Sequence, residues 1–181
     1  MDHDLALTPV RRIDRLLRTQ PVLWLSSVRP DGGPHIVPIW FSWDGLEVLI
    51  ASKPNAQKVR NLRANPSVML ALGEPEDDFD VGLLEGRAEL LDTHAADGLP
   101  SSHLDKYADR MAAIGLSRDE FLATYSQLIR IRPTRFLPWH GRTTLWSMRQ
   151  WAPEGRVAAA IRRVATSLEP SADQAVLAGL G

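Results

Sequence analysis

The sequence contains no cysteine among its 181 residues, which excludes disulfide bonds, thiol nucleophiles and iron–sulfur ligation. It also lacks any apolar run near the roughly 18 residues that a membrane-spanning helix needs. Its amino terminus carries charges where a signal peptide would have a continuous apolar segment. The formal net charge is −1, so there is no cationic excess for nucleic acid or an anionic membrane. We therefore expect a cytoplasmic protein with neither nucleic-acid nor membrane partners.

The motifs of several common enzyme classes are missing too. No two of the five histidines stand three or four residues apart, so no pair has the helical spacing typical of zinc ligands, and no metal site is predicted. The nucleophile motif G-x-S-x-G and the glycine patterns of Walker and Rossmann loops are absent. The sequence therefore does not predict a hydrolase or a P-loop enzyme.

What the sequence does contain is a succession of short strands separated by turn signals. Asp31-Gly32 and Asp44-Gly45 are strong hairpin dipeptides between apolar runs. Six strands are predicted, at 21–28, 35–43, 46–52, 67–73, 81–92 and 125–139. Helices are expected at 8–19, 53–66, 101–113, 117–125 and 154–168. Ser117 with Glu120 forms a capping-box pattern at the start of the fourth helix. Curled antiparallel strands with peripheral helices predict a mainly β, α+β fold, a six-stranded β-barrel.

The stretch HIVPIWFSWDG, residues 35–45, is apolar at both its odd and its even positions. Strand side chains alternate between two faces, so both faces of this strand need cover. The interior of a small barrel accounts for only one of them. A second partner is therefore predicted for the other face, which carries Pro38 and Trp40.

A second candidate feature is the basic turn between the strand at 46–52 and the helix at 53–66. Ser52 and Lys53 end the strand, and Lys58, Arg60 and Asn61 lie in the helix. Helix amino termini present unpaired N–H groups and the positive end of the dipole, so they favour anions. Lys58 and Asn61, three residues apart, are expected on the polar side of the helix. The alternative is a solvated basic helix face without a ligand.

These segments resemble the pyridoxamine 5′-phosphate oxidase-like superfamily of split β-barrel flavoproteins, and in particular its branch that uses the deazaflavin coenzyme F420. The resemblance lies in LSSVRPDGGPHIVPIWFSWDG (25–45), LIASKPNAQKVRNLRANPSVML (49–70) and VGLLEGRAELLD (81–92). It covers roughly residues 16–92 and implies a split-barrel cofactor-binding domain over 1–138. Residues 139–181 would then be a Trp-rich, helical extension packed on the barrel or on a partner subunit.

The resemblance also implies a homodimer with two cofactor sites at its interface, which would cover the second face of the strand at 35–43. Contacts to the cofactor ring are carried over to four consecutive residues, and contacts to its phosphate to five residues of the basic turn. The ring contacts are Val37, Pro38, Ile39 and Trp40; the phosphate contacts are Ser52, Lys53, Lys58, Arg60 and Asn61. No catalytic acid or base is assigned.

The implied activity is hydride transfer from reduced F420 to a small organic acceptor, because the cofactor supplies such chemistry and the protein orients it. FMN-dependent oxidoreduction on the same fold is the nearest alternative. A non-catalytic flavin- or deazaflavin-binding protein and a purely structural interaction protein are the others. The substrate itself is not predicted, since segments 95–125 and 138–181 carry no recognisable motif.

Overall fold

The computed structural model describes residues 9–73 and 81–139. Its helices are α1 (Pro9–Thr19), α2 (Gln57–Ala64), α3 (Ala95–Gly98), α4 (Ser101–Lys106), α5 (Ala108–Ala113) and α6 (Arg118–Thr124). Its strands are β1 (Leu23–Val28), β2 (Pro34–Ile39), β3 (Ser42–Trp43), β4 (Val48–Ser52), β5 (Ser67–Leu72), β6 (Val81–His94) and β7 (Gln127–Trp139). The helix predicted at 154–168 and the extension beyond residue 139 lie outside the described residues. No described helix is long and apolar enough to span a bilayer.

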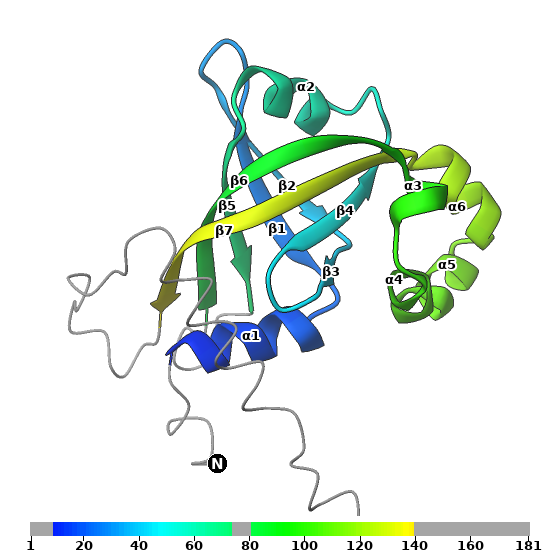
Figure 1. Cartoon of the computed structure of the whole chain (residues 1–181), viewed down its shortest axis with the longest axis horizontal. Coiled ribbons are helices and arrows are strands. Elements are labelled where there is room, and N and C mark those ends of the chain that lie inside the picture. The colour runs from blue at the N-terminus through cyan, green and yellow to red at the C-terminus, as the bar shows by residue number, and fades with distance from the viewer. Residues whose placement is uncertain (1–8, 74–80, 140–181) are drawn as a thin grey trace, which may run out of the picture.

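The strands form one antiparallel sheet of seven, in the order β2-β1-β5-β6-β7-β4-β3. Its two edge strands, β2 and β3, are neighbours in sequence and are separated only by Trp40 and Phe41. Because only two residues join the edge strands, the two edges of the sheet must lie close together at this point. The sheet is therefore strongly curled, as Figure 1 shows. A mainly β fold with peripheral helices is confirmed.

The prediction of a six-stranded barrel differs from the structure in two respects: residues 9–73 and 81–139 form seven strands, and their sheet is open. The difference arises because the strand predicted at 35–43 is broken at Phe41. The Phe41 N–H donates to the Tyr107 hydroxyl at 2.9 Å instead of to a neighbouring strand. The two halves of the stretch then pair with different partners, β2 with β1 and β3 with β4.

The main core fills the concave side of the sheet. Alternate residues of the strands point into it, as expected from the two-residue period of a strand. Helix α1 adds Ile13, Leu16 and Leu17 to this core, and α2 adds Val59 and Leu62. Figure 1 places α1 and α2 at opposite ends of the curled sheet, so the two helices close the ends of the core.

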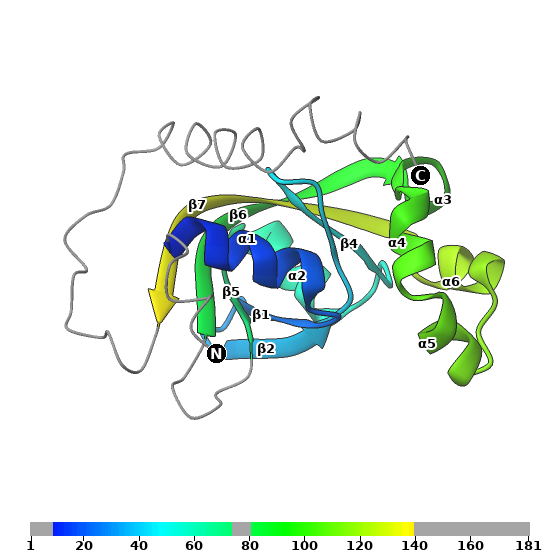
Figure 2. The same cartoon turned by 90° about the horizontal axis from the view of Figure 1, so that it is seen from below.

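A second, smaller core lies outside the sheet. The chain between β6 and β7 forms α3 to α6, which pack together around Tyr107, Met111 and Phe121. Leu128 of β7 and Trp40, from the break between β2 and β3, join this cluster. Figure 2 shows the four helices as a separate lobe at one end of the molecule. The predicted capping box at Ser117 is confirmed, since Ser117 Oγ accepts from the Glu120 N–H and the Glu120 carboxylate accepts from the Ser117 N–H.

Candidate functional site

The polar network beneath α2 joins this helix to strand β1. The Asn61 amide nitrogen donates to Ser27 Oγ at 2.9 Å, and Asn61 Oδ1 accepts from Gln57 Nε2 at 2.7 Å. Asn61 is completely buried, and Ser27 is nearly so. Asn61 therefore does not lie on the polar outer side of the helix, where the sequence analysis placed it. Its amide is used to fix α2 on the sheet, because a buried amide must be hydrogen-bonded.

Lys58 lies on the same inward-facing arc of α2. Successive helical residues are rotated by about 100°, so Lys58 falls between the buried residues Asn61 and Val59 around the helix. Burial disfavours its charged form and holds the pKa of Lys58 below its ordinary value. Among the residues that the structure describes, no carboxylate pairs with it. Lys58 is thus a half-buried cation next to the helix amino terminus, a position that favours an anion.

The other residues of the basic turn play different parts. Arg60 donates to the Asn55 carbonyl at 2.6 Å and to Gln57 Oε1 at 2.5 Å, so its guanidinium holds the turn before the helix. Ser52 is buried, and its hydroxyl donates to the Lys53 carbonyl at 3.2 Å. Lys53 is exposed, with its ammonium 5.6 Å from the centre of the Tyr125 ring. Lys53 and Lys58 are therefore the two cations of the turn that remain available to an anion.

The amino terminus of α2 is open to a ligand as well. Its N-cap residue is Ala56, whose side chain has no acceptor for the first-turn N–H groups. A serine or aspartate at this position would normally satisfy one of them. An external phosphate oxygen can do so instead, and the helix dipole favours its negative charge.

The four residues predicted to contact the ring are divided between two faces of β2. Val37 and Ile39 point into the main core, whereas Pro38 is exposed on the outer face. Trp40 lies beyond the end of the strand, with its ring stacked on Tyr107 at a centroid distance of 4.6 Å. Because β2 pairs only with β1 among the described strands, its second edge keeps backbone groups for a ligand.

The bend at Trp40 and Phe41 has partners that sequence reasoning missed. The Tyr107 hydroxyl accepts from the Phe41 N–H and lies 2.8 Å from the Pro21 carbonyl and 3.0 Å from the Phe41 carbonyl. Burial raises the pKa of Tyr107 to about 12, so this hydroxyl keeps its proton. Lys106 donates to the Phe41 carbonyl at 3.3 Å. The helical spacing of 101–113 predicted these residues on a helix, but no local signal indicated which strand they hold.

Ser42 and His103 form a contact that resembles a nucleophile with its base. Ser42 Oγ lies 2.6 Å from His103 Nδ1. His103 Nε2, however, is buried and has no hydrogen-bond partner among the described residues, so none of their carboxylates orients the ring as in a catalytic triad. Desolvation, with a smaller effect of Lys106, lowers the pKa of His103 to about 4. The Ser42–His103 contact links α4 to the start of β3. The described part of the chain also holds no cluster of metal-ligating side chains.

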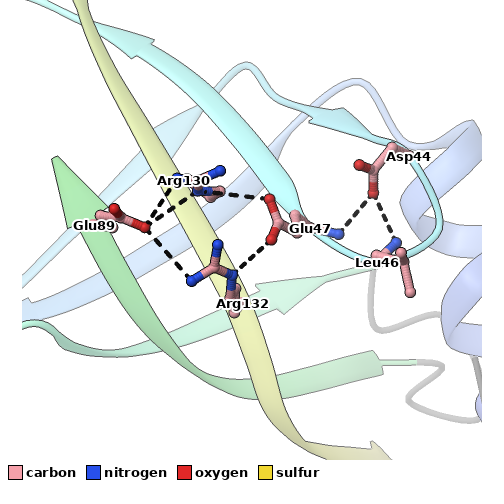
Figure 3. Close-up of polar contacts among 6 residues, drawn as sticks. All are labelled: Asp44, Leu46, Glu47, Glu89, Arg130 and Arg132. Atoms are coloured by element: carbon pink, nitrogen blue, oxygen red, sulfur yellow. Dashed lines mark hydrogen bonds and ion pairs between the residues drawn. The ribbon is translucent and has the colours of Figure 1, made fainter. Parts of the chain in front are cut away.

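The outer surface of the sheet has two halves of opposite character. On one half, Glu47 in the turn before β4 and Glu89 of β6 form a closed set of ion pairs with Arg130 and Arg132 of β7 (Figure 3). Asp44 fixes the turn that presents Glu47, since its carboxylate accepts from the N–H groups of Leu46 and Glu47 at 2.7 Å each. The two carboxylates and the two guanidinium groups of this set therefore compensate one another.

The other half of the outer surface, on β2, β1 and β5, is apolar. Trp24 is 46% exposed and Ile36 59% exposed. Cross-strand neighbours extend the patch, because Trp24 pairs with Pro38 and Ala71, and Ser26 pairs with Ile36 and Met69. We call this surface, made by Trp24, Val28, Ile36, Pro38, Met69 and Ala71, the apolar face. Contiguous exposed apolar surface is more common at interaction sites than on the rest of a protein surface.

The family model described as pyridoxamine 5′-phosphate oxidase matches residues 10–140, most of the chain. The chain therefore belongs to the pyridoxamine 5′-phosphate oxidase family, as its motifs indicated. A comparison with curated protein sequences found no match.

Solved structures share the fold. An F420 reductase is 27% identical, with a TM-score of 0.56 over 68% of this chain and 94% of its own. A conserved hypothetical protein from Mycobacterium tuberculosis is 24% identical, with a TM-score of 0.59 over 82% of this chain and 94% of its own. An FAD-binding protein from Mesorhizobium loti is 20% identical, with a TM-score of 0.52 over 68% of this chain and 88% of its own. Two of the three are described as proteins of flavin or deazaflavin chemistry.

Proposed function

We propose that this protein is an oxidoreductase that binds reduced coenzyme F420 and passes a hydride to a small organic acceptor. Membership of the pyridoxamine 5′-phosphate oxidase family supports a flavin-type cofactor, and the 27% identity to an F420 reductase supports the deazaflavin. The observation that carries the proposal is Lys58, a half-buried cation with no described ion-pair partner beside an uncapped helix amino terminus. Such a charge costs stability unless a ligand compensates it.

The residues of the site fit a phosphate-bearing ring. The phosphate would lie between Lys58, Lys53 and the first N–H groups of α2, while Asn61 and Arg60 hold that turn in shape from within the protein. The ring would lie along the open edge of β2 and the bend at Trp40. The bound cofactor supplies the hydride. The protein's part is to bind the phosphate, orient the ring and keep water away from it.

The second candidate is FMN in place of F420, supported by the family itself and by the FAD-binding structure of the same fold. Both cofactors fluoresce, so the two can be compared by titrating each into the purified protein and following the change in emission. If the protein binds FMN and does not bind F420, FMN replaces F420 as the proposed cofactor. If the protein binds either cofactor but its reduced form is never oxidised by an acceptor, a non-catalytic carrier is the better description.

We propose further that the site is completed by a second copy of the chain, docked through the apolar face. The same sheet pairs Glu47 and Glu89 with arginines on one half of its outer surface and leaves the apolar side chains Trp24 and Ile36 exposed on the other. Bringing two such faces together about a two-fold axis would bury both and place the open edge of β2 at the interface. The exposed Pro38 would then have the second partner that the sequence predicts for this strand, whereas Trp40 is already packed on Tyr107 and Phe121 of the helical lobe.

Sedimentation velocity tests this assembly. The wild type should sediment as a dimer and Ile36→Lys as a monomer, because the variant places a charge in the apolar face. Leu46→Lys is the matched control, since Leu46 is an exposed apolar residue in the turn before β4 and lies outside the apolar face. A monomeric wild type, or a dimer that Ile36→Lys leaves intact, would contradict docking through this face.

A further inference from the structure

Three side chains of the helical lobe hold the three consecutive residues Trp40, Phe41 and Ser42, where the chain bends between β2 and β3. His103, Lys106 and Tyr107 stand at i, i+3 and i+4, so they project from one face of α4 and its C-cap. Each reaches the bend between β2 and β3. His103 meets Ser42, Lys106 meets Phe41, and Tyr107 meets both Phe41 and Trp40. We call this set of contacts the bend clamp.

The contacts replace the sheet hydrogen bonds that the bend has lost. Phe41 N–H and C=O are both within hydrogen-bond distance of the Tyr107 hydroxyl, at 2.9 Å and 3.0 Å. The Lys106 ammonium also lies 4.0 Å from the centre of the Phe41 ring. Tyr107 is fully buried, and its ring lies parallel to that of Trp40, with an interplanar angle of 3°. The helical lobe therefore fixes the direction in which the chain leaves β2.

We propose that His103, Lys106 and Tyr107 are positioning residues for the cofactor ring, acting through the bend at residues 40–42. This inference rests on the proposed function, because Pro38, Ile39 and Trp40 are the residues expected along the ring. Without the clamp, the stretch can straighten toward the single strand that its sequence favours. The cofactor then binds only the molecules that are bent. The apparent association constant is therefore the intrinsic one multiplied by the fraction of molecules in the bent form.

The test uses Tyr107→Phe, which keeps the stacked ring and removes the hydroxyl. Backbone hydrogen exchange should speed up at Phe41, since its N–H loses its acceptor. The dissociation constant for F420 or FMN should rise about tenfold, as expected for unsatisfied buried backbone groups. The affinity for inorganic phosphate, measured by competition with the cofactor, should stay within about twofold, because the phosphate end of the site is separate. A general structural defect would weaken the binding of the cofactor and of inorganic phosphate alike.

Ser117→Ala is the matched control. It removes the capping box of α6, weakens the same helical lobe, and touches none of residues 40–42. Its cofactor affinity should equal that of the wild type. The inference is overturned if Tyr107→Phe binds the cofactor within about twofold of wild type, or if Ser117→Ala weakens binding equally. A wild type that binds neither cofactor overturns the proposed function, and the inference with it, whereas wild-type binding retained by Tyr107→Phe refutes the inference alone.

Discussion

The substitution Lys58→Met tests whether Lys58 binds the cofactor phosphate or is only a solvated surface charge. If Lys58 binds the phosphate, the variant should have a higher free energy of unfolding but a lower affinity for the cofactor. In the cofactor-free protein the Lys58 ammonium is partly desolvated without a described partner. Methionine has a similar length and no charge, so it should raise the free energy of unfolding by about 0.5 kcal/mol at neutral pH. The gain is small because the ammonium keeps part of its hydration.

The loss of cofactor affinity should be larger. Unit charges about 4 Å apart attract by about 4 kcal/mol at an effective dielectric constant of about 20. Part of that is offset by desolvation, and hydrogen bonds to charged groups contribute about 1.5–3 kcal/mol net. The dissociation constant for F420 or FMN should therefore rise roughly 10- to 150-fold. Fluorescence titration measures this change, and urea unfolding measures the stability.

The pH dependence gives the same prediction an independent check. Burial lowers the pKa of Lys58 from 10.5, so at pH values between the folded and unfolded pKa the unfolded chain binds more protons. Stability must then rise with pH across that window just below 10.5. The free-energy cost of burying the charged Lys58 ammonium is fully present at pH 7. It is relieved as the pH approaches 10.5 and the folded protein loses this proton. Lys58→Met should lack this rise.

Arg63→Met is the matched control, because it removes one positive charge from the same helix. Arg63 is exposed in the last turn of α2, where a cation favours the helix dipole. The control should bind cofactor within about twofold of wild type and lose about 0.3–1 kcal/mol of stability. Equal loss of affinity in both variants, or unchanged affinity in Lys58→Met, would refute the assignment of Lys58 to the phosphate.

Three further predictions concern the residues that support the site. Asn61→Ala removes the hydrogen bonds that Asn61 makes to the Ser27 hydroxyl and the Gln57 amide. Urea unfolding should therefore show a free energy of unfolding lower by about 1–3 kcal/mol, and a loss under about 0.5 kcal/mol would contradict the anchoring role of Asn61. Gly86→Ala places a methyl group 2.8 Å from Ile131 Cγ2, which should cost about 1–3 kcal/mol; neutral stability would show that β6 and β7 can move apart. His103 has a pKa of about 4 when folded, so the free energy of unfolding should fall by about 3 kcal/mol between pH 6.5 and pH 4, and His103→Asn should show a flatter profile.

Local chemistry explains which parts of the fold could be predicted. Gly32 and Gly45 adopt φ values of 84° and 97°, the left-handed region that the Asp-Gly turns indicated. The capping box at Ser117 needs only residues three apart. Each of these signals lies within a few consecutive residues, so the turns and the capping box can be predicted from the sequence alone.

The break between β2 and β3 could not be predicted in this way. Residues 35–43 have the composition of one continuous strand, and the bend is imposed by Tyr107, 66 residues further along the chain. Asn61 shows a similar limit. A polar residue on a helix is expected to face solvent, and only its pairing with Ser27 on a different strand makes burial acceptable. Both errors arise from hydrogen bonds between segments far apart in the sequence.

The most direct measurement of the central claim is a parallel titration of the purified protein with F420 and with FMN, followed by fluorescence, in the wild type and in Lys58→Met. The account predicts saturable binding of F420 to the wild type, and binding weaker by at least about tenfold in the variant. Wild-type protein that leaves the emission of both cofactors unchanged at every concentration would contradict it.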